Sequence, residues 1–269
     1  MILADVFRNS HLSRDAELTT SSTDEPLFCQ FAASNGKDAA DAAELVAKYV
    51  NGVDINCGCP QAWAIQEGIG AHLSKNPDIV EDIISQVKRR TSSVKMDNRD
   101  SFPCSIKIRI DSDLKKTVEL CQRAEKMGCD LITVHGRLRN QKNEGKPNLD
   151  AIKLVKEHVS IPVFGNGGVE SLEQANQMVQ ATGVDGVMVA QGLLKNPAMF
   201  QTPLTPNSCV SDFVSQSINH GSCFFIFHHH LQYMLEDQMS RSERKYFNAL
   251  PSTSAVLDYL YSTGILLEE

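Results

Sequence analysis

The stretch Val53-Asp54-Ile55-Asn56-Cys57-Gly58-Cys59-Pro60-Gln61 joins a short apolar segment to a polar turn that carries two thiols. The alternation of valine and isoleucine predicts a buried strand, and the glycine and proline predict its end. Cys59 then lies just beyond the carboxyl end of the strand, where a rigid scaffold can direct a side chain toward a ligand. Two small buried hydrophobic residues are the alternative interpretation of this cysteine pair.

Short strands alternate with helices on both sides of this stretch, over residues 27–190. The six predicted strands lie within residues 26–33, 53–57, 105–110, 130–137, 161–168 and 185–192, and each of the last two ranges includes the glycine-rich turn that follows its strand. Regular alternation predicts a parallel sheet. Polar or glycine residues follow nearly every strand, as they do in the active-site loops of a barrel. A doubly wound sheet would instead carry G-x-G-x-x-G after its first strand, which this sequence lacks. We therefore predict an α/β fold of the (β/α)8 TIM-barrel type.

Both ends of the chain differ from a complete barrel. A barrel has eight strands, and residues 1–7 add at most the end of one strand to the six, before a polar loop that reaches Asp24. We therefore expect the first strands of the barrel to be missing. After Pro206 the pattern predicts helices over residues 213–260 and no strand. The expected domains are an incomplete barrel at residues 1–203 and a small all-helical domain at residues 204–269.

Charge, hydropathy and cysteine content indicate which partners and which cellular compartment to expect. A formal net charge of -7 argues against general polyanion binding, although a local basic patch could still meet nucleic acid. No apolar run approaches the ~18 residues of a spanning helix, and residues 1–5 do not form a signal peptide. The eight cysteines lack a compact spacing, which predicts free thiols in a reducing compartment. We expect a cytoplasmic or nuclear protein without membrane association.

Two glycine-rich turns follow the last two predicted strands, at Asn166-Gly167-Gly168 and at Ala190-Gln191-Gly192. In barrels, the loops after the seventh and eighth strands commonly bind a phosphate through backbone N–H groups. Each turn alone could be an ordinary strand end. Their occurrence together, in this order, predicts a phosphate-binding site.

Lys107 lies in the middle of a predicted strand among isoleucines and shares one face of it with Arg109. Barrel strands have no exposed edge, and burying an unpaired cation is costly, so we expect Lys107 to contact an anion or a flavin ring. His135 ends the next strand and precedes Gly136 and Arg137. A lone histidine is usually structural, but at the carboxyl end of a barrel strand it indicates a functional role.

The thiol of Cys59 could act near a reacting carbon as a nucleophile or as a general acid, depending on its pKa and its geometry. A zinc site built from Cys57, Cys59 and the run His228-His229-His230 is not expected. Their spacing does not match the usual ligand patterns. We therefore predict no metal.

With these residues in view, the chain resembles the dihydrouridine synthase family, from residue 30 through residue 200 and into the helical tail. The motifs that carry the resemblance are Asn56-Cys57-Gly58-Cys59-Pro60, Lys107-Ile108-Arg109, His135-Gly136-Arg137, Asn166-Gly167-Gly168 and Gly192-Leu193-Leu194-Lys195-Asn196-Pro197. Their order and spacing are more specific than any one motif. The stretch around Cys59 and the tail Phe247-Asn248-Ala249-Leu250 are most similar to the eukaryotic branch that modifies D-loop uridines 20a and 20b.

The resemblance implies an FMN-dependent barrel followed by a helical tRNA-binding domain, in a protein that we expect to be a monomer. NADPH (or NADH) would reduce FMN, the flavin would deliver hydride to C6 of a uracil, and Cys59 would protonate C5. Asn56 joins Cys59 in the catalytic set, and Cys57 is a spectator. The implied flavin contacts are Gln30, Lys107, His135, Asn166, Gly167, Gly168, Ala190 and Gln191.

The target base would have to be extruded from the tRNA, at a cost of a few kcal/mol. Basic residues of the barrel and the tail could hold tRNA phosphates, although solvated surface charges are the alternative. These residues are Arg109, Arg137, Arg139, Lys142, Lys146, Arg241, Arg244 and Lys245.

Three positions depart from the family pattern. The Ala-Pro-Met-like flavin motif of the first family strand has no counterpart, Gln191 replaces a common arginine, and Gly168 replaces a common aspartate.

Two other hypotheses remain open beside a synthase. One is a truncated, non-catalytic paralogue that retains at most tRNA binding. The other is an FMN barrel oxidoreductase for a free small molecule, against which the basic loop and the helical tail argue.

Overall fold

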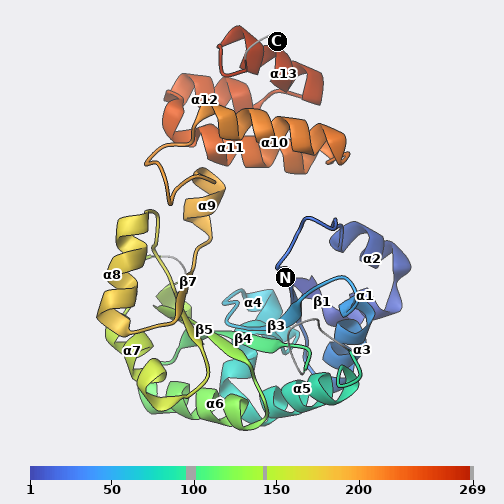
Figure 1. Ribbon diagram of the computed structural model, residues 1–269, viewed down its shortest axis with the longest axis vertical. Helices are drawn as coiled ribbons and strands as arrows, with labels where there is room; N and C mark the ends of the chain where they lie inside the picture. Colours follow the sequence, from blue (N-terminus) through green and yellow to red (C-terminus); the bar gives the residue numbers. More distant parts are fainter. Residues whose placement is uncertain (95–100, 142–143, 267–269) are drawn as a thin grey trace. The chain divides into compact units, whose positions relative to one another are not determined.

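The computed structural model describes residues 1–94, 101–141 and 144–266, and Figure 1 shows its ribbon. The chain divides into two compact units. The first is Met1–Gly167 with Gln177–Met188, and the second is Gly168–Asn176 with Val189–Glu269. The division into independent domains at residues 203 and 204 stays a prediction. Within the described ranges, no helix combines the length and the apolarity that crossing a membrane requires.

The first unit is built on a parallel sheet of seven strands, whose order in space is their order in the chain. The strands are β1 (Ile2–Leu3), β2 (Phe28–Ala32), β3 (Gly52–Cys57), β4 (Cys104–Ile110), β5 (Leu131–Leu138), β6 (Val163–Asn166) and β7 (Gly186–Met188). Figure 1 shows α3, α5, α6 and α7 on the outer side of the curved sheet. This sequential β-α winding is that of a barrel and confirms the predicted α/β class.

Most helices of the first unit begin where a polar side chain or a proline predicts. Asn35, Asp113 and Asn148 accept backbone N–H groups as N-caps, and Pro77 occupies a first-turn position. The helices are α1 (Ala4–Asn9), α2 (His11–Glu17), α3 (Gly36–Val46), α4 (Ala62–Gln66), α5 (Pro77–Arg90), α6 (Leu114–Lys126) and α7 (Leu149–His158), with the 3-10 segments η1 (Gly70–Lys75) and η2 (Arg139–Gln141). The boundary between the two units falls within α8 (Leu172–Thr182).

The prediction for the first 24 residues was partly wrong. Only Ile2–Leu3 is strand, and α1 and α2 replace the rest of the predicted strand end and much of the predicted polar loop. Ser10 Oγ accepts the N–H of Ser13 at 3.2 Å and so caps α2. Arg14 Nη1 donates to the carbonyl oxygens of Phe7 (2.9 Å) and Arg8 (3.1 Å), which satisfies carbonyls at the end of α1. Capping by Ser10 and Arg14 therefore supports these helices, together with the buried side chains of Ala4 and Phe7 on α1.

The outer face of the sheet is apolar and packs against the helices. Ile55, Ile106 and Ile132 of three adjacent strands are each 0% exposed. Each pairs directly with the next across the sheet, so all three point to one side. The core of the first unit therefore lies between this face and the surrounding helices.

The second unit is helical beyond Pro206, as predicted, with no strand in its described part. Its helices are α9 (Gln191–Lys195), α10 (Asn207–Asn219), α11 (Phe224–Leu235), α12 (Arg241–Asn248) and α13 (Thr253–Ser262), with the 3-10 segment η3 (Glu236–Gln238). Their core contains Val210, Phe227, Leu231, Leu235, Phe247, Val256 and Leu260. Ser240 and Glu243 form a capping box that begins α12.

Candidate active site

The inner face of the sheet, opposite the helices, carries polar side chains in rows that cross neighbouring strands. Directly paired residues of parallel strands point to the same side of a sheet, so the register identifies each row. The rows are Gln30, Asp54 and Ser105, then Asn56, Lys107 and Thr133, then Arg109, His135 and Asn166. The rows approach the carboxyl ends of the strands, where barrels place their active sites.

Cys59 lies in a turn that is fixed from two directions. Asn56 Oδ1 accepts the N–H groups of Gly58 (3.2 Å) and Cys59 (2.9 Å), which closes an Asx-type turn directly after β3. The Cys59 carbonyl oxygen accepts the N–H of Ala71 at 2.9 Å. Gly70 permits this approach, because its φ is +63° and a Cβ there would lie 2.9 Å from Cys59 Cβ. The strand β3 and the segment η1 therefore position the thiol together.

A chain of hydrogen bonds joins this turn to the neighbouring strands. Asn56 Nδ2 donates to Gln30 Oε1 at 2.9 Å, and Gln30 Nε2 donates to Asp54 Oδ2 at 2.6 Å. Ser105 Oγ donates to Asp54 Oδ1, also at 2.6 Å. Burial raises the pKa of Asp54, while the hydrogen bonds from Ser105 and Gln30 lower it. Sequence reasoning missed Asp54 and Ser105, although strand alternation places both on the face of Asn56 and Lys107.

Cationic side chains gather on the inner face beside this chain. Burial lowers the pKa of Lys107 to about 8, and the charge of Asp54 opposes that shift. Burial and the nearby charge of Arg137 lower the pKa of Arg109. A negative charge on Cys59 would raise both values, so its sulfur lies within electrostatic range of both cations. Partly desolvated cations in such a cluster favour an anionic or strongly polar ligand.

His135 is held as a neutral imidazole. Arg137 Nη1 lies 3.1 Å from His135 Nε2, and since a guanidinium only donates, Nε2 accepts and Nδ1 carries the proton. Burial and the charges of Arg109, Lys107 and Arg137 lower the pKa of His135 to about 3. Arg137 Nε also donates to the carbonyl oxygen of Gly145 at 2.9 Å. The hydrogen bonds and the pKa therefore agree on the protonation state of His135.

The end of β6 forms the neighbouring rim of this site. Asn166 Nδ2 donates to the Met188 carbonyl oxygen at 2.7 Å, which ties β6 to β7. Gly167 has a φ of +124°, and a Cβ there would lie 2.9 Å from His135 Cδ2. Glycine is therefore required at this position both by its backbone conformation and by the space beside the imidazole.

The basic residues predicted to meet tRNA differ in exposure within the first unit. Arg109 and Arg137 are each only 9% exposed, and Arg109 Nη1 donates to the Leu138 carbonyl oxygen at 3.2 Å. Arg139 and Lys146 are exposed. Lys142 lies outside the described residues.

The remaining predicted contacts belong to the second unit. Gly168 has a φ of +69°, and a Cβ on Gly192 would lie 2.7 Å from the Val169 carbonyl oxygen. Gly192, the last residue of the second predicted phosphate turn, therefore lies beside the residue that follows Gly168, and the roles of Ala190 and Gln191 there stay predictions.

The basic residues of the tail lie on α12. Arg244 Nη1 is 3.8 Å from Glu236, which also pairs with Lys195 Nζ at 3.3 Å. Arg241 and Lys245 are exposed and form no ion pair within the described part of the chain. Of the three residues, these two have the charge that is most readily available to a phosphate.

Other thiols lie in the core and differ from Cys59. Cys57, Cys104, Cys121 and Cys129 are buried. Burial raises their pKa values, to about 12 for Cys129 and well above the ordinary range for Cys57. These cysteines are therefore neutral thiols of the core. In the part of the chain that the structure describes, no group of three or more His, Cys, Asp or Glu residues could hold a metal ion.

Comparison with known proteins agrees with this geometry. The family model for dihydrouridine synthase (Dus) matches residues 1–258. A mouse protein named as a tRNA-dihydrouridine(20a/20b) synthase (NAD(P)+)-like protein is 50% identical over 261 residues, which cover 97% of this chain and 78% of the relative. Its human counterpart is 48% identical over the same share of this chain and 80% of its own length. A Schizosaccharomyces pombe tRNA-dihydrouridine(20a/20b) synthase is 40% identical over 97% of this chain and 77% of its own length.

Among solved structures, DHODH from Eimeria tenella in complex with ferulenol superposes with a TM-score of 0.50 at 14% identity, over 71% of this chain and 58% of that one. At this identity the likeness shows the fold alone. The family model and the relatives cover the sheet, the Cys59 turn and most of the helical tail. The chain belongs to the dihydrouridine synthase family of oxidoreductases.

Proposed function

We propose that this protein is a tRNA-dihydrouridine synthase that holds FMN, takes electrons from NADPH (or NADH) and saturates the C5–C6 bond of uridine. The observation that carries the proposal is the position of the Cys59 thiol. It lies in a built turn at the carboxyl end of β3, within electrostatic range of Lys107 and Arg109. The names of the mouse, human and yeast relatives support positions 20a and 20b of tRNA as the substrate and a nicotinamide cofactor as the reductant.

The inner face of the sheet fits a flavin ring. Amide, ammonium and imidazole groups of Gln30, Lys107 and His135 lie in adjoining rows and offer hydrogen bonds to ring carbonyls and ring nitrogens. Thr133 Oγ1, directly opposite Lys107, is a buried polar atom without a partner in the described ranges, so the middle row has hydrogen-bonding capacity left. Gly167 leaves open the space beside His135 that a Cβ would fill. When bound, FMN would supply the hydride that adds to C6 of the uracil.

Cys59 supplies the proton for C5 in this proposal. Its S–H bond breaks, the electron pair at C5 forms the new C–H bond, and the negative charge is left on the sulfur. Lys107 and Arg109 are in range to stabilise that thiolate, which is the arrangement expected of a general acid in a partly desolvated site. Solvent then returns a proton to the sulfur.

Asn56 and Arg137 act as positioning residues in the same proposal. Asn56 binds two N–H groups of the Cys59 turn and the Gln30 side chain, so these three hydrogen bonds hold the turn in place. Arg137 donates to Nε2 of His135 and leaves Nδ1–H as the donor that the imidazole can offer. A protonated Nδ1 suits a flavin carbonyl or nitrogen acceptor.

The test is a reconstitution with purified components. The protein is purified, its visible absorbance is recorded with and without added FMN, and it is incubated with NADPH and unmodified tRNA. We expect a flavin spectrum and dihydrouridine at positions 20a and 20b, and no product on a tRNA whose two target uridines are replaced by cytidine. Colourless protein that does not bind added FMN would contradict the proposal and favour a non-catalytic paralogue. NADPH oxidation that is indifferent to tRNA would favour a small-molecule oxidoreductase.

A further inference from the structure

A pocket adjoins the Cys59 turn within the first unit. It has a volume of about 210 Å³ and is formed by η1, by the ends of β4 and β5, and by η2. Its charged and hydroxyl side chains are Ser74, Lys75, Arg109, Asp111, Ser112 and Arg139. No aromatic side chain is among its described lining residues. It therefore offers charge and hydrogen bonds but no surface on which a base could stack.

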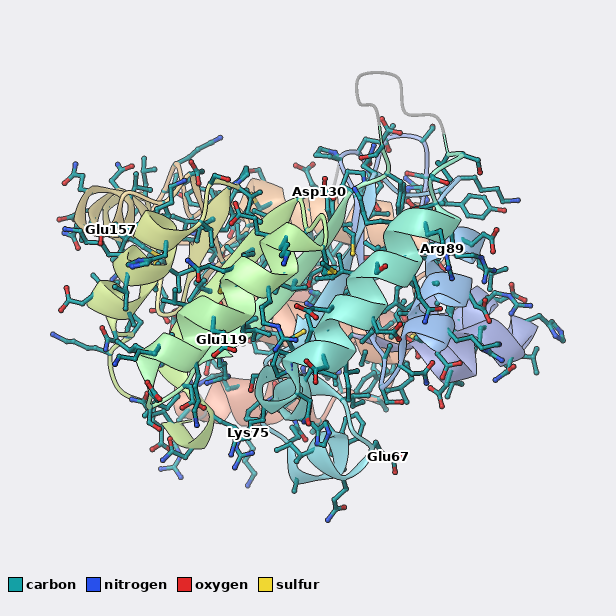
Figure 2. The ribbon with its side chains drawn as sticks, turned by 90° about the horizontal axis from the view of Figure 1, so that it is seen from below. Glu67, Lys75, Arg89, Glu119, Asp130 and Glu157 are labelled. Atoms are coloured by element: carbon teal, nitrogen blue, oxygen red, sulfur yellow. The ribbon has the colours of Figure 1, made fainter. Side chains whose placement is uncertain are left out.

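Two of the lining residues connect this pocket to the thiol. Ala71 lines the pocket and donates its N–H to the Cys59 carbonyl oxygen at 2.9 Å. Arg109 lines it as well and lies within electrostatic range of Cys59. Asp130 directly precedes β5 and so marks the amino ends of the strands. In Figure 2, Lys75 and Glu67 lie at the opposite end of the unit from Asp130. The pocket therefore lies at the carboxyl ends of the strands, as the Cys59 turn does.

The charges in the pocket suit a phosphate. Lys75 and Arg139 are both exposed, and neither forms an ion pair with another described residue. Their charges are therefore available to a ligand. An arginine fork can bind two phosphate oxygens at once, and an ammonium adds a point charge beside it.

The one carboxylate of the described lining suits a hydroxyl. The N–H of Asp113, the hydroxyl of Ser112 and the charges of Lys116 and Lys75 lower the pKa of Asp111, although burial opposes them. Asp111 therefore stays ionised at neutral pH and can only accept hydrogen bonds. A ribose 2′-hydroxyl is a donor that such a group can recognise, and it distinguishes RNA from DNA.

We propose that this pocket binds the ribose and phosphate of the tRNA nucleotide next to the target uridine. Lys75 and Arg139 contact its phosphate, and Asp111 accepts a hydrogen bond from its 2′-hydroxyl. The inference rests on the proposed function. A base extruded toward Cys59 brings its flanking phosphates with it, and contacts to flanking nucleotides are a known source of selectivity in enzymes that act on extruded bases. A nicotinamide dinucleotide also contains ribose phosphates and is the other source of the same chemistry.

The test compares Lys75→Gln, Arg139→Gln and Asp111→Ala with Lys153→Gln. Lys153 is the matched control, since it is a half-exposed lysine of α7 whose Nζ lies 3.9 Å from Glu157. Filter binding of an unmodified tRNA transcript is measured over a salt series, which requires neither flavin nor turnover. We expect Lys75→Gln and Arg139→Gln each to weaken binding several-fold and to reduce the slope of log K against log salt by about 0.7–0.9. Lys153→Gln should change neither quantity.

The role of Asp111 is tested with tRNA that carries a 2′-deoxy nucleotide next to the target uridine. Two such tRNAs are used, one with the 2′-deoxy nucleotide before the target uridine and one with it after. We expect wild-type protein to bind one of the two a few-fold more weakly than the all-ribose tRNA. Asp111→Ala, which has no acceptor, should bind that tRNA and the all-ribose tRNA equally. Equal losses in both proteins would overturn the hydroxyl contact. Circular dichroism of each variant confirms that the fold is retained.

The two sources of ribose phosphate are separated by following flavin reduction by NADPH without tRNA. We expect Lys75→Gln and Arg139→Gln to leave its concentration dependence unchanged. If the variants weaken NADPH binding but not tRNA binding, the pocket holds the dinucleotide and the proposal is wrong. Wild-type protein that makes no dihydrouridine would instead contradict the proposed function. Normal wild-type activity with unchanged tRNA binding in both variants would contradict the pocket assignment alone.

Discussion

The two faces of the seven-stranded sheet are made by alternate residues of the same strands and behave in opposite ways. On the outer face, Ile106 and its neighbours are fully buried among helices, and the thiol of Cys57 is neutral. On the inner face, Lys107 keeps a charge that burial disfavours, and Thr133 has a hydroxyl without a partner in the described chain. The outer face therefore stabilises the fold, while the inner face keeps groups that become satisfied only when a ligand binds.

The sharpest test of this contrast compares Cys57, the last residue of β3, with Cys59 in the turn that follows. Cys59→Ala should reduce dihydrouridine formation by about 10²–10⁴-fold, the usual contribution of a general acid, and leave FMN bound. Cys57→Ala, the matched control, should retain turnover and lower only the free energy of unfolding. Single-turnover assays with the prereduced protein and unmodified tRNA measure the first effect. Comparable losses of turnover in both variants, or loss of flavin from Cys59→Ala, would remove the distinction between the two thiols.

A core substitution on the outer face should have the largest effect on stability. Ile106→Ala is expected to lower the free energy of unfolding by about 2–5 kcal/mol, because Ile106 is 0% exposed and its neighbours can collapse only in part. The matched inner-face change, Thr133→Val, removes the unpaired hydroxyl at nearly constant volume and should be neutral or stabilising. Urea unfolding of the apoprotein compares the two. A large destabilisation by Thr133→Val would show that the Thr133 hydroxyl forms a hydrogen bond that stabilises the folded apoprotein.

The inner face should also make the apoprotein sensitive to acid through His135. The folded protein binds this proton only near pH 3, whereas the unfolded chain binds it near pH 6.5. The unfolded state therefore holds more protons in between, and the free energy of unfolding falls as the pH drops from about 6.5 to about 3. The expected loss from this group is ~3 kcal/mol at pH 4. His135→Gln should flatten that part of the pH profile of urea unfolding, and an unchanged slope would contradict the neutral imidazole.

The smallest expected effect comes from removing the charge of Lys107 from the inner face. Lys107→Met should raise the free energy of unfolding of the apoprotein by about 1–3 kcal/mol at pH 7, because a desolvated charge is replaced by an apolar side chain. The same variant should bind FMN more weakly, as measured by quenching of flavin fluorescence. The sign of the change in the free energy of unfolding shows whether Lys107 serves a ligand or the fold. Lower stability of the apoprotein would mean that Lys107 supports the fold rather than a ligand.

The strands and the thiol turn could be predicted from sequence because the signals are local. Alternation of Val53 and Ile55 identifies β3, and the following glycine and proline mark its end. The same period of two places Lys107 and Arg109 on one face of β4, as the register confirms. The existence of an inner polar face was therefore visible in the sequence.

The partners across that face could not be predicted, because they depend on register between strands far apart in the chain. Ser105 reaches Asp54 across 51 positions, and the sequence gives no sign that the carboxylate is bound. Arg137 illustrates the same limit. Its charge suggests a phosphate contact, but its guanidinium is buried against His135. The Lys75 pocket likewise forms only where η1 meets the ends of β4 and β5.

The contacts of Cys59 with Gly70 and Ala71 affect which parts of the chain can change in length and sequence. The hydrogen bond from Ala71 and the close approach of Gly70 close residues 59–71 into a loop whose two ends are fixed to each other. Loop-closure entropy changes only slowly with length, so insertions between the ends cost little once the ends are held. Exposed positions such as Gln66 and Glu67 are thus places where length and sequence can diverge while the sulfur keeps its position, whereas Ala64 and Ile69 are buried beside Cys59.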